Sequence, residues 1–203
     1  MTTNAASSNA NQGDTVLTTC LREETRPEHD RIEAALDIPD SIREPTDYVR
    51  LLAGFYTFYQ PLEQQLLRLD WQGSDIDMEA RRKAPLLARD LEACGTKPEG
   101  LTFCSQLPPL RDATEGLGCL YVLEGATLGG EVIHRRLHTG FGSWLENRDR
   151  FYRCYGDERG HMWRAFKQAA NHFGQACDPA DQSRTIDTAR TTFRLLQAWL
   201  ERR

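Results

Sequence analysis

The sequence lacks any apolar run approaching the roughly 20 residues that a membrane-spanning helix needs. It also lacks an excess of basic residues, because 25 Lys and Arg stand against 30 Asp and Glu and the formal net charge is -5. Proteins that bind nucleic acid usually present a basic surface, so neither a membrane nor nucleic acid is expected as a partner. The first residues do not resemble a signal peptide, and we therefore expect a cytoplasmic protein.

Patterned cysteines and common catalytic motifs are also missing. The six cysteines form no C-x-x-C pair and no framework spacing, which argues against structural zinc and fits thiols kept reduced in a cytosol. The chain contains no G-x-S-x-G elbow, no P-loop and no G-x-G-x-x-G turn after a strand. Hydrolase, P-loop and dinucleotide-binding classes consequently have no motif in their favour.

What is present is a helical pattern. Large apolar residues recur at three- and four-residue steps, and strand-like alternation with turn dipeptides is absent. This pattern predicts an all-α, single-domain fold of perhaps six to eight helices. Residues 1–14 are rich in Ser, Thr, Asn and Ala, so we expect a disordered tail there and a folded domain over 15–203.

Two prolines are expected to shape the helices. Residues 47–69 predict one long helix that bends near Pro61. Pro27 is expected either to kink the first helix or to begin a new one, and in the second case Thr25 and Glu28 would form a capping box.

The first candidate for chemistry is His29, which lies on one predicted helical stripe with Leu21, Ile32 and Leu36. A single histidine on such a face is by default a core or boundary residue. Glu33, one turn later, weakens that interpretation, because its carboxylate can accept a hydrogen bond from Nδ1 and leave Nε2 free to bind iron.

A second group, Glu131, His134 and His138, has the spacing that can chelate a metal ion from one helix face. Arg135 and Arg136 lie between these residues, and their charges oppose the binding of a divalent cation. We rank this group below His29 as a metal site.

The segment from Leu120 to Leu137 has a helical apolar pattern but contains Gly125, Gly129 and Gly130. Each glycine inside a helix costs about 1 kcal/mol relative to Ala. Such glycines allow either close packing between helices or close approach of the backbone to a flat ligand. The pattern alone leaves both interpretations open.

Three stretches, "LREETRPEHDRIE", "LYVLEGATLGGEVIHRRL" and "YGDERGHMWRAFKQAAN", together resemble the haem oxygenase family. The resemblance is strongest to bacterial members that make biliverdin for bacteriophytochromes, and it extends from about Val16 to the C-terminus. It implies a haem oxygenase-like fold in which haem lies between two helices. The proximal helix supplies an axial histidine, and a kinked distal helix covers the other face of the haem with its glycines.

The resemblance also implies roles for individual residues. His29 matches the axial iron ligand, and Glu33 matches the carboxylate beside it. The catalytic distal glycines are matched by Gly125, Gly129 and Gly130. Haem-binding positions near the propionates or the haem edge are matched by Arg22, Thr25, Tyr121 and Arg164.

One position departs from the family pattern. Many family members have an aspartate just after the first distal glycine, where it anchors water, and this chain has Ala126 there. The resemblance therefore implies that another group, such as Thr127 or an arginine from elsewhere, organises the distal water, or that turnover is altered.

The activity implied by the resemblance is oxidative cleavage of haem to biliverdin, carbon monoxide and ferrous iron, with haem b as both cofactor and substrate. Dioxygen and an external ferredoxin or flavoprotein reductase are the implied partners, because the chain has no flavin or nicotinamide motif. A bacteriophytochrome is the candidate acceptor of biliverdin. The basic residues considered for docking the reductase are Arg135, Arg136, Arg148 and Arg150.

Three rival functions stay open on the sequence. The strongest is a haem carrier or sensor of the same fold that does not cleave haem. A non-haem di-iron oxidase would need several inward Glu and His ligands, for which the chain offers only one local cluster. A purely structural helical domain would leave His29 as an ordinary core residue.

Overall fold

The structure is a computed structural model that describes residues 16–202, and the tail predicted over residues 1–14 lies outside this range. Residues 16–202 contain helices and no strand, which confirms the all-α prediction. The α-helices of this range are α1 (Leu17–Glu24), α2 (Arg26–Leu36), α3 (Pro45–Leu66), α4 (Ala84–Ala93), α5 (Ala113–Phe141), α6 (Arg159–Ala176) and α7 (Pro179–Leu200). Short 3-10 helices are η1 (Glu79–Arg81), η2 (Pro98–Gly100), η3 (Gly142–Leu145) and η4 (Gly156–Glu158).

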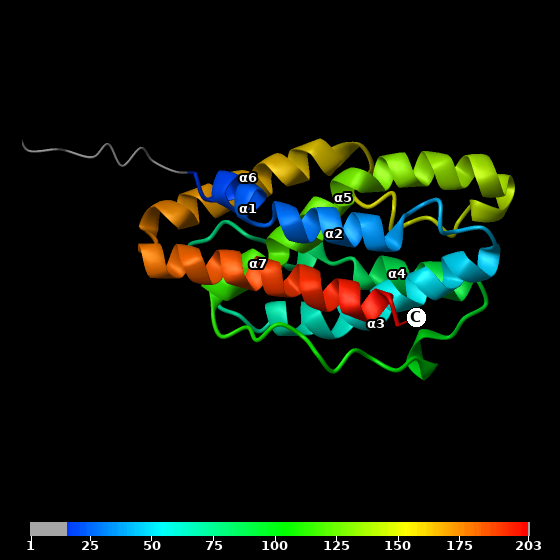
Figure 1. Cartoon of the computed structure of the whole chain (residues 1–203), viewed down its shortest axis with the longest axis horizontal. Helices are drawn as coiled ribbons and strands as arrows, with labels where there is room; N and C mark the ends of the chain where they lie inside the picture. The colour runs from blue at the N-terminus through cyan, green and yellow to red at the C-terminus, as the bar shows by residue number, and fades with distance from the viewer. Residues whose placement is uncertain (1–15, 203) are drawn as a thin grey trace, which may run out of the picture.

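Helix α7 organises the bundle. It packs along α2, α3 and α5, while α1 packs against both α6 and α7 (Figure 1). The two halves of the long helix α5 do not lie on one straight line in this view, as expected of a kinked helix. No helix within the described range is long and apolar enough to cross a membrane.

The first helical segment is divided at Thr25, so Pro27 stands in the first turn of a new helix. This is the second of the two predicted alternatives, but the predicted capping box is wrong. The Thr25 hydroxyl donates to the Leu21 carbonyl at 2.6 Å, back into the preceding turn, and therefore does not cap α2. Glu28 is instead buried and accepts hydrogen bonds from α7.

Helix α3 continues through Pro61. A proline has no amide hydrogen, so the carbonyl of Thr57, four residues earlier, loses its helical partner. The amide of Cys104 donates to that carbonyl at 2.9 Å. The long connection between α4 and α5 is thus attached to α3 at the point where the proline interrupts the helical hydrogen bonds.

Helices α5 and α7 approach each other very closely. A Cβ atom placed on Gly118 would lie 2.0 Å from the carbonyl oxygen of Thr185, so a side chain at that position cannot be accommodated without moving the helices apart. The Thr185 hydroxyl also donates to the Thr114 carbonyl at 3.2 Å across the same contact.

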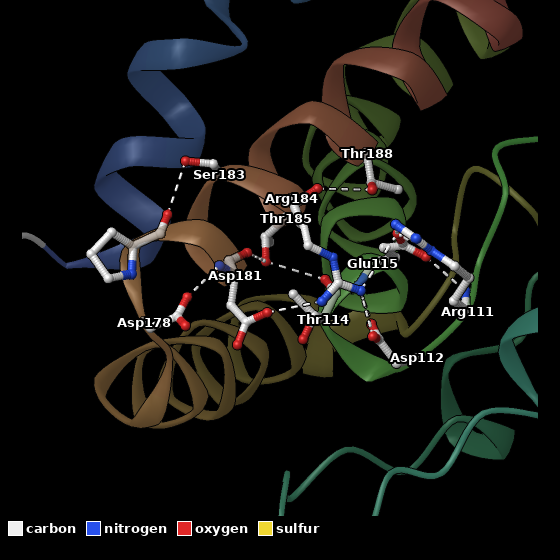
Figure 2. A network of polar contacts seen from close by, with 11 residues as sticks. Arg111, Asp112, Thr114, Glu115, Asp178, Asp181, Ser183, Arg184, Thr185 and Thr188 are labelled. Atoms are coloured by element: carbon white, nitrogen blue, oxygen red, sulfur yellow. Dashed lines mark hydrogen bonds and ion pairs between the residues drawn. The ribbon is translucent and has the colours of Figure 1, made fainter.

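A network of charged groups joins the N-terminal ends of α5 and α7 (Figure 2). Asp112 caps α5 by accepting from the Glu115 amide at 3.2 Å, and Asp178 caps α7 by accepting from the Asp181 amide at 2.8 Å. Arg184 donates to Asp112 and, at 2.8 Å, to Asp181. The network thus ties the start of α5 to the start of α7.

Candidate functional site

A cavity of about 920 Å³ lies between α1 and α2 on one side and the middle of α5 on the other. Its volume falls in the range of small-molecule and cofactor pockets. Further walls come from α3, α6, α7 and the segment that precedes η4. The predicted site residues that line the cavity are Arg22, Thr25, His29, Glu33, Tyr121, Gly125, Gly129 and Gly130, whereas Arg164 is not among the lining residues.

His29 forms part of the α2 wall, with 52% of its side chain exposed. Its Nδ1 lies 3.6 Å from an oxygen of Glu33 and 3.8 Å from an oxygen of Asp30. The imidazole also packs edge-on against Phe193 of α7, with ring centroids 5.9 Å apart. Because Nδ1 faces two carboxylates, Nε2 is the nitrogen left to act as a metal ligand.

The opposite wall contains two glycines that are open to the cavity. A Cβ atom placed on Gly125 or Gly129 would meet no atom within 4 Å. Gly130 is different, because a Cβ there would lie 2.8 Å from the carbonyl oxygen of Tyr152. The two interpretations left open by the sequence therefore apply to different residues: Gly125 and Gly129 leave space for a ligand, and Gly130 allows close packing of α5 on a neighbouring segment.

The histidine and the open glycines fit a flat ligand with a metal at its centre. An imidazole nitrogen is a common axial ligand of haem iron. The bare backbone opposite it provides a surface that a side chain would otherwise occupy. The donor set and the open wall are thus both suited to haem.

Cations and hydroxyl groups stand on the rest of the lining. Arg22 is exposed, and its nearest carboxylate, on Glu23, is 3.9 Å away, so its guanidinium is largely free to bind an anion. Tyr121 is buried enough that desolvation raises its pKa, against the opposing effects of Thr25 and Arg22. Lys167 on α6 also lines the cavity, one turn after Arg164.

Arg164 is exposed on α6, and its Nη1 would lie 3.4 Å from a Cβ placed on Gly160. The guanidinium thus extends toward the preceding turn of its own helix. A basic side chain on the cavity wall is supplied by Lys167 in its place.

The interior end of the cavity carries polar groups that the sequence analysis did not single out. Tyr59 of α3 and Tyr152 are buried and line the cavity, and within residues 16–202 neither hydroxyl has a hydrogen-bond partner. Burial raises the pKa of both phenols, so they keep their protons at neutral pH and can donate to water or to a ligand.

Lys83 lines the same cavity and belongs to a buried network behind the glycine wall. Its ammonium donates to Glu124 at 2.5 Å and to the carbonyl of Arg81 at 3.0 Å. The guanidinium of Arg81 donates to the other oxygen of Glu124 at 2.7 Å, and the Tyr155 hydroxyl donates to Glu124 at 2.8 Å. Glu124 directly precedes Gly125, so the network lies next to the open part of α5.

Tyr155 has a φ of 68°, an uncommon left-handed backbone conformation for a bulky residue. This conformation accompanies the hydrogen bond that its hydroxyl makes to Glu124.

The position after Gly125 is occupied by Ala126, which is exposed and lines the cavity without a polar group. Thr127 also lines the cavity, but its hydroxyl donates to the Glu124 carbonyl of its own helix at 2.7 Å. The hydroxyls of Tyr59 and Tyr152 are therefore more available than that of Thr127 to donate a hydrogen bond to water in the cavity.

The second predicted metal group is dispersed. His134 Nε2 lies 2.7 Å from an oxygen of Asp149, and Glu131 is bound by Arg159 at 3.0 Å. Among the described residues, the His, Cys, Asp and Glu side chains close enough to share a metal ion are His29, Asp30 and Glu33. The low rank given to the Glu131, His134 and His138 group is therefore consistent with the structure.

The four arginines considered for docking a reductase are engaged within the chain. Arg135 and Arg136 pair with carboxylates at 3.7 and 2.5 Å. Arg148 donates to main-chain carbonyls, and Arg150 pairs with the buried Asp90 at 3.3 Å. Arg148 and Arg150 therefore support the structure of the chain itself, whereas Arg135 and Arg136, with 70% and 55% of their side chains exposed, remain on the surface.

The sequence of the chain is similar to those of known proteins. A family model described as "Heme oxygenase" matches residues 15–202. A protein of Xanthomonas campestris pv. campestris (strain 8004), named "Heme oxygenase", is 37% identical over 90 residues, which is 43% of this chain and 47% of that protein. The match thus spans about half the length of this relative.

Solved structures with a similar fold cover more of the chain. Heme oxygenase from Neisseria meningitidis, solved with NO and CO bound, superposes with a TM-score of 0.76 at 20% identity and covers 93% of this chain and 92% of its own. Heme oxygenase from Leptospira interrogans gives a TM-score of 0.77 at 19% identity, over 93% of this chain and 100% of its own. At these identities, the likeness establishes the fold alone.

Proposed function

We propose a function for this chain, which belongs to the haem oxygenase family. It binds haem b in the cavity between α2 and α5 and cleaves the haem oxidatively. The proposed products are biliverdin, carbon monoxide and ferrous iron. The observation that carries this proposal is the pairing of His29 on one wall with the side-chain-free positions Gly125 and Gly129 on the other.

Haem supplies the redox chemistry and is itself the molecule that is cut. The contribution of the protein is to bind, orient and shield it. His29 would hold the iron through Nε2, and the carboxylates of Glu33 and Asp30, 3.6 and 3.8 Å from Nδ1, would orient the imidazole. A neutral imidazole is a weaker electron donor than a cysteine thiolate, which suits a reaction that does not require early cleavage of dioxygen.

The distal wall sets the space above the haem plane. The backbone at Gly125 and Gly129 can approach the ligand closely, since no side chain intervenes. Such a wall would restrict the space open to dioxygen beside a bound haem.

Protons are delivered, in this proposal, from the interior end of the cavity. Tyr59 and Tyr152 have protonated hydroxyls without another acceptor in residues 16–202, so they can hold an ordered water. The ammonium of Lys83 lies on the same lining and is fixed by Glu124. These groups take the place of the aspartate that the chain lacks at Ala126.

The propionates are assigned to the cations on the lining. Arg22 and Lys167 provide the positive charges, and Thr25 and Tyr121 provide hydroxyl groups. Lys167 replaces Arg164 in this role because Arg164 is not among the lining residues.

The proposal includes two protein partners, one that donates electrons and one that receives biliverdin. An external ferredoxin or flavoprotein reductase supplies electrons, and a bacteriophytochrome receives biliverdin. Both are inferred from the resemblance to bacterial family members.

The test is a titration of the full chain with hemin, followed by reduction in air with a ferredoxin and its reductase. We expect a histidine-ligated Soret band that disappears as biliverdin absorption grows. His29→Ala should abolish the histidine-ligated spectrum, whereas the control His172→Ala, an exposed histidine on α6 that is not among the lining residues, should not.

One rival function has a specific observation in its favour. Ala126 leaves the α5 wall without the usual carboxylate, and a haem carrier or sensor that does not turn haem over would not need one. A Soret band that persists through reduction in air, with no biliverdin formed, would support this rival and refute the enzymatic proposal.

A further inference from the structure

Helix α2, which carries His29, buries few of its residues against the rest of the bundle, and one of them is a carboxylate. Of its eleven residues, only Glu28 and Ile32 are buried. Glu28 is the residue directly before His29, and its carboxylate is 5% exposed. A carboxylate with so little contact to water is unfavourable unless charged partners compensate for the lost hydration.

The main partner of Glu28 comes from the far end of the sequence. Arg194 on α7 donates to one oxygen of Glu28 from Nη2 at 2.9 Å and from Nε at 3.3 Å. Arg31 of α2 itself adds a third hydrogen bond to the same oxygen at 3.1 Å. The carboxylate beside His29 is thereby tied to a helix 166 residues away in sequence.

A second arginine of α7 holds the other side of the same junction. Arg190 donates to the carbonyl of Glu24 at 2.9 Å and to its carboxylate at 2.5 Å. Glu24 is the last residue of α1, and Thr25 separates it from α2. Because α2 does not continue the helical path of α1, its orientation is not set by helix geometry and needs contacts of this kind.

Phe193 lies between the two arginines on α7 and contacts the imidazole of His29. Residues 190, 193 and 194 share one helix face, as residues three and four apart do. One face of α7 therefore holds the end of α1, the residue before His29 and the ring of His29.

We propose that Arg194 and Arg190 are positioning residues for the haem ligand. By tying Glu28 and Glu24 to α7, they fix the direction in which His29 presents Nε2 to the cavity. This inference rests on the proposed function, because it takes His29 as the axial ligand.

The experiment compares Arg194→Gln with Arg184→Gln in the full chain. Both remove a charged pair of α7, but Arg184 binds Asp112 and Asp181 at the opposite end of the helix from α2. We expect Arg194→Gln to release ferric haem to excess apomyoglobin about three- to tenfold faster, since the pair is only partly shielded from water. It should also shift the iron–histidine stretching frequency in resonance Raman spectra of the ferrous complex. Arg184→Gln should change neither readout.

Two further measurements separate positioning from general stability. Amide hydrogen exchange of the haem-free protein should quicken over residues 17–36 in Arg194→Gln and not in Arg184→Gln. Arg194→Lys should restore part of the wild-type haem release rate, because it keeps the charge. Glu28→Gln combined with Arg194→Gln should release haem no faster than either single variant.

The inference is overturned if Arg194→Gln has the wild-type release rate and stretching frequency, or if Arg184→Gln shifts both equally. His29→Ala distinguishes this failure from failure of the proposed function. A histidine-ligated spectrum that survives His29→Ala would refute the ligand assignment and the inference together. Loss of that spectrum with an unchanged Arg194→Gln would refute the inference alone.

Discussion

Replacing glycine with alanine should change the Tm in opposite directions at different positions of α5. Gly125→Ala and Gly129→Ala each add a methyl group where no atom lies within 4 Å. Replacing a helical glycine with alanine removes a backbone entropy cost of about 0.5–1 kcal/mol. For a domain of this size, each substitution should raise the Tm of the haem-free protein by about 2–4 °C per kcal/mol gained.

The same methyl groups enter the space assigned to haem. Crowding a packed contact by one methyl group typically costs about 1–3 kcal/mol, and 1.4 kcal/mol corresponds to a tenfold change in Kd. We therefore expect Gly125→Ala and Gly129→Ala to weaken haem binding by about tenfold while they stabilise the haem-free protein.

Two control glycines should behave in the opposite way. At Gly130 an added Cβ would lie 2.8 Å from the carbonyl oxygen of Tyr152, and at Gly118 it would lie 2.0 Å from that of Thr185. Alanine at either position should lower the Tm, with the larger loss at Gly118, because backbone atoms cannot move aside as a flexible side chain can.

The assay is thermal unfolding of the haem-free variants by circular dichroism, with haem Kd measured by absorbance titration. The reasoning is refuted if Gly125→Ala and Gly129→Ala both lower the Tm and leave the Kd unchanged. That result would mean that these glycines serve helix packing, as Gly118 does.

Three further predictions concern the cavity lining and the helix ends. Tyr59→Phe and Tyr152→Phe remove hydroxyls that have no partner in residues 16–202, so each variant should unfold at the wild-type urea concentration or above it while biliverdin formation slows; a loss of stability with unchanged product formation would contradict the proposed water site. Glu115→Gln should lower the free energy of unfolding by about 1 kcal/mol at pH 7. Hydrogen bonding from a neighbouring arginine holds the pKa of Glu115 below its ordinary value of 4.5, so its stabilising effect is fully present above that value and is lost as the pH falls through the lowered pKa. Urea unfolding curves of this variant and the wild type should converge as the solution is acidified, and a difference that stays constant with pH would disprove the linkage. Lys167→Ala should raise the haem Kd about threefold, whereas Arg164→Ala should leave it unchanged, and the reverse order in absorbance titrations would restore Arg164 as the propionate-binding residue.

Local spacing in the sequence was enough to predict the parts of the site that lie within single helices. His29 and Glu33 are four residues apart, and the structure places Nδ1 of one 3.6 Å from the carboxylate of the other. Gly125 and Gly129 likewise share a helix face, and both are open to the cavity. Helical periodicity carries this information directly, because residues four apart in a helix always lie close together.

Parts of the site formed by distant segments were not predictable in this way. Lys83 follows two arginines, and nothing in its neighbourhood in the sequence shows that Arg81 and Lys83 are buried and pair with Glu124, 41 residues after Lys83. Tyr152 belongs to a segment outside the α-helices that packs closely on α5 at Gly130, a contact that spacing in the sequence does not reveal. Arg164 and Lys167 are both basic residues of α6, and only the rotation of that helix in the bundle decides which of them lines the cavity.

The capping box at Thr25 failed for a related reason. The sequence supplied a suitable pair, Thr25 and Glu28. In the structure, Glu28 pairs with Arg194 of α7 and the Thr25 hydroxyl donates to the Leu21 carbonyl, so neither side chain caps α2. The local sequence determines which capping hydrogen bonds are possible, and tertiary contacts determine which of them form.

The attachment of α2 to α7 has a consequence for the time at which the pocket forms during synthesis. The cavity is lined by Thr18 of α1 and by Phe193 and Leu196 of α7. Residues from both ends of the described range must therefore be in place together before the lining is complete. A growing chain that has not yet produced α7 lacks this part of the cavity lining. Contacts of such long sequence separation form late and slow folding. The proposed haem site is therefore complete only when the last helix of the described range has been synthesised and packed.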